Sequence, residues 1–135
     1  MKIVIDTNCL LRILPQKSEY RCLWDAFLRG EFDLCYTTDM LAEYEEIFSR
    51  FYSPKAGEFV VGVLLKSYNT IQVTPHFKWN LITEDTDDNK FVDCALNAGA
   101  DYIVTNDRHF DILKFLIFPP IKVVNIYTFK SILGL

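Results

Sequence analysis

The sequence is poor in the residues that build several common kinds of site. Its 135 residues include only five glycines and two histidines, and its four cysteines form no C-x-x-C pair. Isolated histidines and cysteines argue against a zinc site, which groups such ligands at short spacings. No stretch matches the glycine-rich phosphate loop of nucleoside triphosphatases, so that class is disfavoured as well.

Excess positive charge and long apolar runs are also missing. The net charge is -4, whereas proteins that bind nucleic acid through bulk charge are basic. Any nucleic-acid role must therefore use a local site, or cations that screen the phosphates. The longest apolar run is far too short to span a membrane, and the chain enters a strand-like stretch directly after Met1, which leaves no room for a signal peptide. The cysteines lie among apolar residues, as reduced core thiols do, so we expect a cytoplasmic protein with no membrane contact.

Hydrophobic residues make up half of the chain, which predicts a single domain over residues 1–135 with a substantial core. Short β-branched stretches alternate with stretches of helical periodicity, and residues 76–86 fit neither pattern. This alternation predicts a three-layer α/β/α fold around a mostly parallel sheet of about five strands. The predicted strands lie within 2–5, 32–37, 70–75, 101–105 and 122–126; the predicted helices lie within 18–32, 39–52, 53–68, 88–100 and 127–135, with a short helix or turn over 108–116.

Acidic residues follow two of the predicted strands. Asp6 comes directly after the first strand, and Asp107 follows the fourth. Sites in parallel α/β sheets form outside the carboxyl ends of the strands, near the point where the strand order reverses. A single aspartate in such a position is usually a turn former or a helix cap. Two in equivalent positions favour a shared crevice.

Helical acids can reach the same edge of the sheet. Glu43 and Glu45 lie on opposite borders of the apolar stripe of their helix, and periodicity does not choose between them. Asp88 lies on a border of the next stripe, in the first turn of the predicted 88–100 helix. Asp87 is predicted to cap that helix, and Asp93 to face solvent. Converging carboxylates repel one another and raise each other's pKa, unless a hard divalent cation such as Mg²⁺ lies between them.

Four stretches carry a resemblance to a known family: "IVIDTN", "LAEYEEIFSR", "TDDNKFVDCALNAGADYIVTND" and "KVVNIYTF". Over nearly its whole length the chain resembles the PIN domain family, in the branch of VapC-type toxins of toxin–antitoxin systems. The resemblance implies an α/β fold and a ribonuclease that depends on Mg²⁺ or Mn²⁺. It also implies that Asp6, Glu43, Asp88 and Asp107 are the catalytic residues and metal ligands, which selects Glu43 over Glu45.

Further residues are predicted to support this site. Thr7 and Asn8 match the small hydroxyl or amide that the family has beside its first acid. Asn106 departs mildly from the family, which commonly has glycine there, and with Thr105 it leads into the last acid. Four basic residues are candidates to guide the RNA backbone, although each is equally well explained as a solvated charge: Arg12, Arg50, Lys90 and Arg108.

The leading hypothesis is therefore an endoribonuclease, the toxin of a type II toxin–antitoxin pair. Its predicted partners are an RNA substrate and a cognate antitoxin, with a second copy of the chain as a further candidate. One alternative is a catalytically weak PIN scaffold that binds RNA or a protein, although the acid set is complete. Another is a phosphatase of the haloacid-dehalogenase type. That chemistry requires Asp-x-Asp after the first strand, and position 8 is asparagine.

Overall fold

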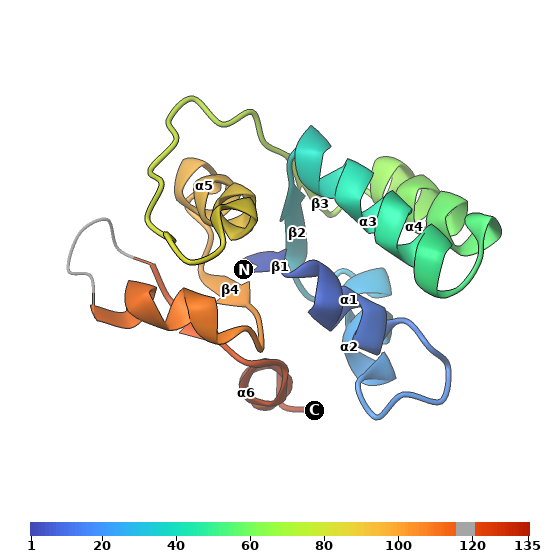
Figure 1. The fold of residues 1–135 in the computed structure, drawn as a ribbon. Helices are drawn as coiled ribbons and strands as arrows, with labels where there is room; N and C mark the ends of the chain where they lie inside the picture. The colour runs from blue at the N-terminus through green and yellow to red at the C-terminus, as the bar shows by residue number, and fades with distance from the viewer. Residues whose placement is uncertain (116–120) are drawn as a thin grey trace.

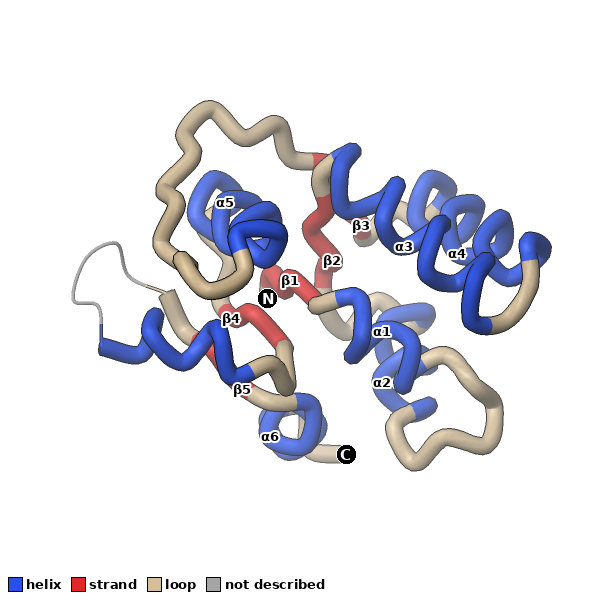
Figure 2. Tube along the Cα trace, in the orientation of Figure 1, coloured by secondary structure: helices blue, strands red, loops and turns tan. Residues whose placement is uncertain are grey.

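The computed structural model describes residues 1–115 and 121–135 and shows strands alternating with helices (Figures 1 and 2). The strands are β1 (Lys2–Ile5), β2 (Asp33–Tyr36), β3 (Thr70–Gln72), β4 (Tyr102–Val104) and β5 (Val123–Val124). The α-helices are α1 (Thr7–Ile13), α2 (Arg21–Leu28), α3 (Thr38–Phe51), α4 (Pro54–Lys66), α5 (Asn89–Ala98) and α6 (Ile126–Ile132). Two 3₁₀ helices complete the described elements: η1 (Thr86–Asp88) and η2 (Arg108–Phe115). The helix or turn predicted over 108–116 is η2, and residue 116 lies outside the described residues.

The five strands form one sheet in the order β3-β2-β1-β4-β5, and all four neighbouring pairs are parallel. The predicted α/β class and sheet are thus confirmed. From β1 the chain builds outward through β2 and β3 on one side, then crosses to β4 and β5 on the other. The strand order therefore reverses between β1 and β4, which is where ligands bind in open parallel sheets.

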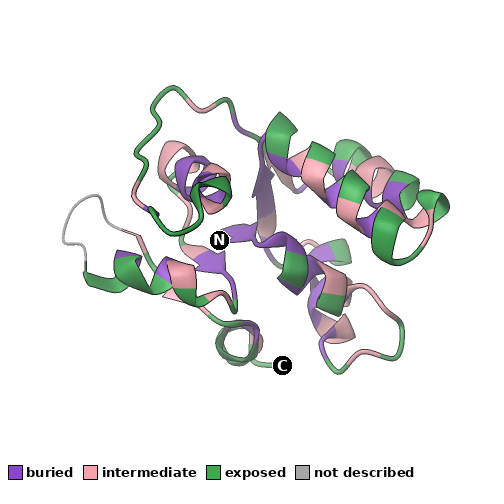
Figure 3. Ribbon diagram, in the orientation of Figure 1, coloured by how far each residue is buried: buried purple, intermediate pink, exposed green. Residues whose placement is uncertain are grey.

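Helices cover the sheet on both sides (Figure 1). Helix α5 packs on β1, β2 and β4. On the other side, α1 and α2 enclose apolar side chains of β1 and β2, and the α6 ring of Phe129 meets Phe32 at 5.2 Å. Helices α3 and α4 lie side by side, and the buried residues concentrate where the helices meet the sheet (Figure 3). None of the helices in the described ranges has the length and apolar character needed to cross a membrane.

Local signals for helix ends are confirmed at several places. The Ser53 side chain accepts a hydrogen bond from the Ala56 backbone N–H, with Pro54 in the first turn of α4. Helix α5 ends at Gly99, whose φ of 65° is readily adopted by glycine. The predicted Asp87 cap is wrong, because the Asp85 side chain accepts the hydrogen bond from the Asp87 N–H at 3.1 Å. A 3₁₀ turn precedes α5, so the capping acid lies two residues earlier than expected.

Helix α1 was not predicted from the sequence. It has only seven residues, and its buried side chains include Cys9, Leu10 and Ile13. So short a helix is not stable alone, and it gains its stability from packing on the sheet. About two turns of helical spacing directly after a strand give too weak a pattern to detect.

Residues 73–85 form a connecting segment with no helix or strand, and α5 holds this segment by its backbone. Three α5 side chains, spaced four residues apart, accept hydrogen bonds from backbone N–H groups of the segment. The pairs are Asn89 with Ile82 (2.9 Å), Asp93 with Trp79 (3.0 Å) and Asn97 with His76 (3.1 Å). The prediction that Asp93 faces solvent is therefore wrong. Its side chain is buried because the connecting segment covers the polar side of α5.

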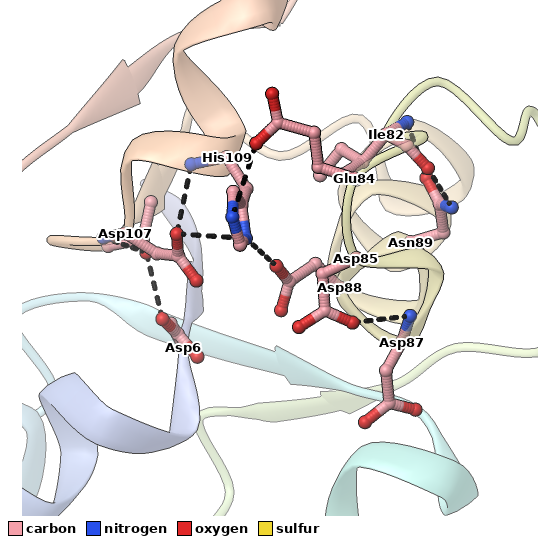
Figure 4. A network of polar contacts seen from close by, with 10 residues as sticks. Asp6, Ile82, Glu84, Asp85, Asp87, Asp88, Asn89, Asp107 and His109 are labelled. Carbon is pink, nitrogen blue, oxygen red and sulfur yellow. Dashed lines mark hydrogen bonds and ion pairs between the residues drawn. The ribbon is translucent and has the colours of Figure 1, made fainter.

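We expect Asn89→Ala to loosen the connecting segment. The Asn89 amide both accepts from the Ile82 N–H and donates to the Ile82 C=O, at 2.9 Å each (Figure 4). Alanine leaves two backbone groups without partners, so the free energy of unfolding should fall by about 2 kcal/mol. Urea denaturation measures this change. Asn97→Ala, at the less buried end of the segment, is the matched control and should cost less; equal losses would contradict the role given to Asn89.

Candidate functional site

Two carboxylates flank the point where the strand order reverses. Asp6 follows β1 at the start of α1 and is almost fully buried. Asp107 follows β4, and the two are linked by Thr105, whose hydroxyl donates to Asp6 Oδ2 at 2.8 Å and accepts the Asp107 backbone N–H at 3.0 Å. A single hydroxyl thus sets the position of both acids relative to each other.

Helix α3 brings Glu43 to the same place. The Thr7 hydroxyl, at the start of α1, donates to Glu43 Oε2. On the other side of this carboxylate, Lys90 Nζ lies 2.6 Å from Glu43 Oε1 and 3.0 Å from Asp87 Oδ1. The neighbouring Glu45 is exposed. Of the two acids that periodicity left open, Glu43 is therefore the one that faces Asp6.

Asp88 completes the cluster from the junction of η1 and α5. Its side chain is only 13% exposed and points toward His109, which lies between Asp88 and Asp107 (Figure 4). His109 Nδ1 is 3.4 Å from Asp88 Oδ2 and 3.3 Å from Asp107 Oδ1, and Nε2 is 3.3 Å from Glu84 Oε2. We refer to Asp6, Glu43, Asp88 and Asp107 as the carboxylate cluster.

Two members of the carboxylate cluster have a raised pKa. Burial is the main cause at Asp6, and the charges of Asp107 and Glu43 raise its pKa further, against the hydrogen bond from Thr105. Burial also raises the pKa of Asp88 to about 6, with contributions from the charges of Asp107, Asp85 and Asp6. The charges of neighbouring acids therefore add to burial in disfavouring the ionised forms of these two carboxylates, Asp6 and Asp88.

Basic partners were not expected in this cluster, and the structure supplies two. Lys90 neutralises Glu43 on one side. On the other side, His109 was regarded as isolated in the sequence, yet it contacts three acids in space. Desolvation lowers the pKa of His109, but the charge of Asp107, the hydrogen bond to Asp88 and the charge of Glu84 outweigh it and hold the pKa above its ordinary value. The only feature of the sequence that could have indicated a role for His109 at this site is its position two residues after Asp107.

The donor atoms suit a divalent cation. The carboxylate cluster offers hard oxygen ligands, the type that Mg²⁺ and Mn²⁺ prefer. Next to it, ligand atoms of Asp85, Asp88 and His109 all lie within 4.8 Å of one another, a second grouping that could hold an ion. Asp88 belongs to both groups. Burial, with a further contribution from neighbouring acids, raises the pKa of Asp6 and Asp88, and a bound cation would favour the ionised form of both carboxylates.

The remaining residues that the sequence singled out are more dispersed. Asn106 Oδ1 accepts the Ile126 N–H at 3.1 Å, so it fixes α6 to the loop after β4, while Asn8 is exposed on α1. Arg12 lies 5.2 Å from the Tyr20 ring centroid, and Arg50 pairs with Glu46 at 2.7 Å. Arg108 is exposed at the start of η2, directly after Asp107. Lys90 and Arg108 thus adjoin the cluster, whereas Arg50 is engaged on the last turns of α3.

The solved structures that are similar to this fold include three from bacteria. VapBC2 from Rickettsia felis, bound to a DNA fragment from its promoter, is 16% identical with a TM-score of 0.63; DNA-bound VapBC from Salmonella typhimurium is 17% identical with a TM-score of 0.60. FitAcB from Neisseria gonorrhoeae is 16% identical with a TM-score of 0.57. Each alignment covers 93% of this chain and 98% of the other. At such low identity these structures establish the fold and nothing more.

Sequence comparison defines the family. No curated protein matches the chain significantly. The family profile of the PIN domain matches residues 2–109, most of the chain and a range that includes all four members of the carboxylate cluster. The chain therefore belongs to the PIN domain family.

Proposed function

We propose that this protein is an endoribonuclease that depends on a divalent cation, Mg²⁺ or Mn²⁺, and that the carboxylate cluster is its active site. One observation carries the proposal: four carboxylates from β1, α3, η1 and β4 meet where the strand order reverses, and burial and mutual repulsion raise the pKa of two of them. A purely structural role does not explain such an arrangement, because the pKa of Asp6 and Asp88 stays raised despite Lys90 and His109, and ionised carboxylates held in this way destabilise the metal-free fold.

The chain's own residues provide the support for such chemistry. A bound divalent cation would neutralise phosphate charge and activate water for hydrolysis of a phosphodiester, leaving 5′-phosphate and 3′-hydroxyl ends. The four carboxylates would hold it. Thr105 orients Asp6 and Asp107, while Thr7 and Lys90 fix the two oxygens of Glu43. Positioning of this kind keeps the ligand oxygens in place without a cost of reorganisation during the reaction.

The test of this function is cleavage of a labelled single-stranded RNA of mixed sequence. We expect internal cleavage in Mn²⁺ or Mg²⁺ and none in EDTA, with 5′-phosphate on the downstream product. No cleavage with any divalent ion would favour the scaffold that binds without cutting. Release of phosphate from small phosphomonoesters, with RNA left intact, would favour the phosphatase alternative.

RNA binding should itself require a divalent cation. The chain carries a net charge of -4, and Lys90 is engaged by two carboxylates, so few cations are available to replace the counterions of RNA. Fluorescence anisotropy with the Asp6→Asn variant should give binding at least about tenfold tighter in Ca²⁺ than in EDTA. Tight binding in EDTA would reveal a basic face and contradict this expectation.

A protein partner is the second part of the proposal. The VapBC structures of similar fold are complexes bound to DNA, and we infer that this chain likewise acts as the toxin beside a small DNA-binding antitoxin. Large apolar side chains of α3, α4 and the adjoining turns lie exposed, enough for an interface with an antitoxin or a second copy: Phe51, Tyr52, Phe59, Leu65 and Tyr68. Expression of the wild-type chain alone should arrest growth of the host cells, and Asp6→Asn should not; equal growth would contradict the toxin assignment.

A further inference from the structure

A polar pocket of about 330 Å³ lies between α3, α5 and the connecting segment. This is the low end of the range for small-molecule sites, roughly 300–1,000 Å³, and suits a single nucleotide unit. Its walls come from four places in the chain, with polar side chains predominating: Thr37, Asp39, Pro75, Lys78, Asn80, Thr86, Asp87, Asn89, Lys90 and Asp93.

The polar pocket shares a wall with the carboxylate cluster. Lys90 and Asp87 line it, and Lys90 Nζ is also 2.6 Å from Glu43 Oε1. Asp87 points away from Asp6 and Asp107, toward the start of α3 (Figure 4). A polymer bound at the carboxylate cluster would therefore have its neighbouring unit at the mouth of the pocket.

The charges of the lining favour a base over a phosphate. Three carboxylates, from Asp39, Asp87 and Asp93, outnumber the ammonium groups of Lys78 and Lys90, and they would repel an anion. Carboxylates accept hydrogen bonds from exocyclic amino groups, as they do from cytosine N4 in duplexes. Adenine, cytosine and guanine carry such a group. Uracil has a carbonyl oxygen where cytosine has its amino group, so at that position it would present an acceptor to the carboxylates.

Some of these groups are occupied and others are available. Asp93 and Asn89 are used to hold the connecting segment, and Asp87 pairs with Lys90. In contrast, the Asp39 and Asn80 side chains have no hydrogen bond or ion pair within residues 1–115 and 121–135. Asn80 also has a φ of 50°, a left-handed conformation that asparagine tolerates better than most residues. Its amide and the Asp39 carboxylate are free polar groups of the lining, as are the Lys78 ammonium and the Thr86 hydroxyl among the described residues.

An unpaired strand fits this surface better than a duplex. Phe77 is 70% exposed on the connecting segment beside Lys78, and exposed aromatic rings bind single-stranded nucleic acid by stacking on its bases. A duplex would offer no base face to such a ring. The segment thus places a ring and a cation next to the polar pocket.

We propose that the polar pocket binds one unpaired base of the RNA substrate and selects bases with an exocyclic amino group against uracil, with Asp39 as the selecting residue and Asn80 as a further hydrogen-bonding partner that can donate or accept. The proposal rests on the ribonuclease function inferred above, and it adds a determinant of sequence preference outside the carboxylate cluster.

Base discrimination is measurable without catalysis. Fluorescein-labelled hexamers of adenylate, cytidylate and uridylate are titrated in Ca²⁺ against Asp6→Asn, and we expect uridylate to bind about tenfold more weakly than cytidylate. Adding Asp39→Asn should reduce that ratio to about threefold or less, whereas Asn80→Ala should weaken the binding of both pyrimidine hexamers and leave the ratio near tenfold. Because both pyrimidines stack weakly, their ratio reports hydrogen bonding more than stacking.

Asp111→Asn is the matched control, since it removes the same charge from an exposed side chain outside the pocket lining. It should keep the full ratio. An unchanged ratio in Asp39→Asn, an equally reduced ratio in Asp111→Asn, or no measurable binding of any hexamer would each overturn the base pocket.

Failure of this proposal is distinguishable from failure of the proposed function. Cleavage by the wild-type chain that needs a divalent ion, combined with equal binding of all hexamers, overturns the pocket and leaves the nuclease. Selective binding by the hexamer assay, combined with no cleavage under any condition, supports the pocket and overturns the nuclease.

Discussion

Asp6→Asn, Asp88→Asn and Asp107→Asn are each expected to lower the rate of RNA cleavage by at least about a hundredfold to a thousandfold. Each change keeps the size of the side chain and removes one charged ligand from the carboxylate cluster. The hydrogen bonds that an amide can still accept, such as that from Thr105 to position 6, should preserve the fold. Single-turnover cleavage of a labelled RNA at saturating Mn²⁺ measures the loss, with far-UV circular dichroism as the check on folding.

Helix α3 provides the matched control for this prediction. Glu43 is held by Thr7 and Lys90, whereas Glu45, two residues later on the same helix, is exposed. Glu43→Gln should be nearly inactive, and Glu45→Gln should stay within about twofold of the wild-type rate, as surface changes do. Equal loss in both variants would show that the site has been placed on the wrong side of α3. Asp93→Asn is unsuitable as a surface control, because Asp93 is buried and holds the connecting segment.

The metal-free protein should become more stable, not less, when Asp88 is replaced by asparagine. The pKa of Asp88 is raised from 3.8 to about 6 in the folded state, mainly because the side chain is buried. A raised pKa means that the folded state favours the protonated form of Asp88 over the ionised form. The stabilisation of the fold by the protonated form is therefore complete below pH 3.8 and is lost as the pH rises through 6. Asparagine is uncharged like the protonated form of Asp88, so the variant keeps this stabilisation at every pH.

The expected gain is therefore largest at neutral pH. Asp88→Asn should exceed wild type in free energy of unfolding by up to about 3 kcal/mol at pH 7.5, and by about 1 kcal/mol at pH 4.5, in EDTA. Denaturant titrations at the two pH values measure this difference. The control Asp111→Asn breaks only an exposed ion pair with Lys114 and should change stability by less than about 1 kcal/mol at either pH.

Excess Mn²⁺ should reverse the order of wild type and Asp88→Asn. Binding only to the folded state stabilises wild type by about 2.7 kcal/mol at a hundredfold excess over the Kd, and the variant should gain much less. An Asp88→Asn protein that is less stable than wild type at pH 7.5 in EDTA would mean that Asp88 has a structural role. Equal gains from Mn²⁺ would mean that the ion binds elsewhere.

The elements of the fold were predictable where a local signal was strong. Short β-branched stretches such as residues 2–5 marked the strands, and Ser53 and Gly99 marked helix ends by their own backbone and side-chain chemistry. Helix α1 was missed because its pattern is only seven residues long, and the 3₁₀ turn before α5 displaced the cap from Asp87 to Asp85. Signals that depend on one or two turns of backbone were the ones that failed.

The partners of the acids were not predictable in the same way. Asp6 and Asp107 could be placed together, because both follow strands and parallel strands end at one edge. Lys90 contacts Glu43, which lies 47 positions away in the sequence, and His109 contacts Asp88, which lies 21 positions away. These contacts arise from tertiary packing, which the periodicity of the sequence does not encode. Asp93 faces away from the apolar stripe of α5, as expected, but a segment without regular structure covers that side. Only the folded arrangement shows where such a segment lies.

The way α5 holds the connecting segment has a consequence for how relatives of this protein can diverge. The segment is held by hydrogen bonds from its backbone N–H groups to the side chains of Asn89, Asp93 and Asn97. Every residue except proline has such an N–H group. Exposed side chains of the segment, such as those of Phe77, Lys78 and Asn80, can therefore be exchanged without breaking these hydrogen bonds, whereas Ile82 is buried in the core. Lys78 and Asn80 line the polar pocket, and Phe77 is next to Lys78 in the chain. The three α5 side chains that hold the connecting segment are therefore under a different constraint from the exposed side chains of that segment. Substitutions in the exposed side chains would change the preference for an RNA target and leave the carboxylate cluster unchanged.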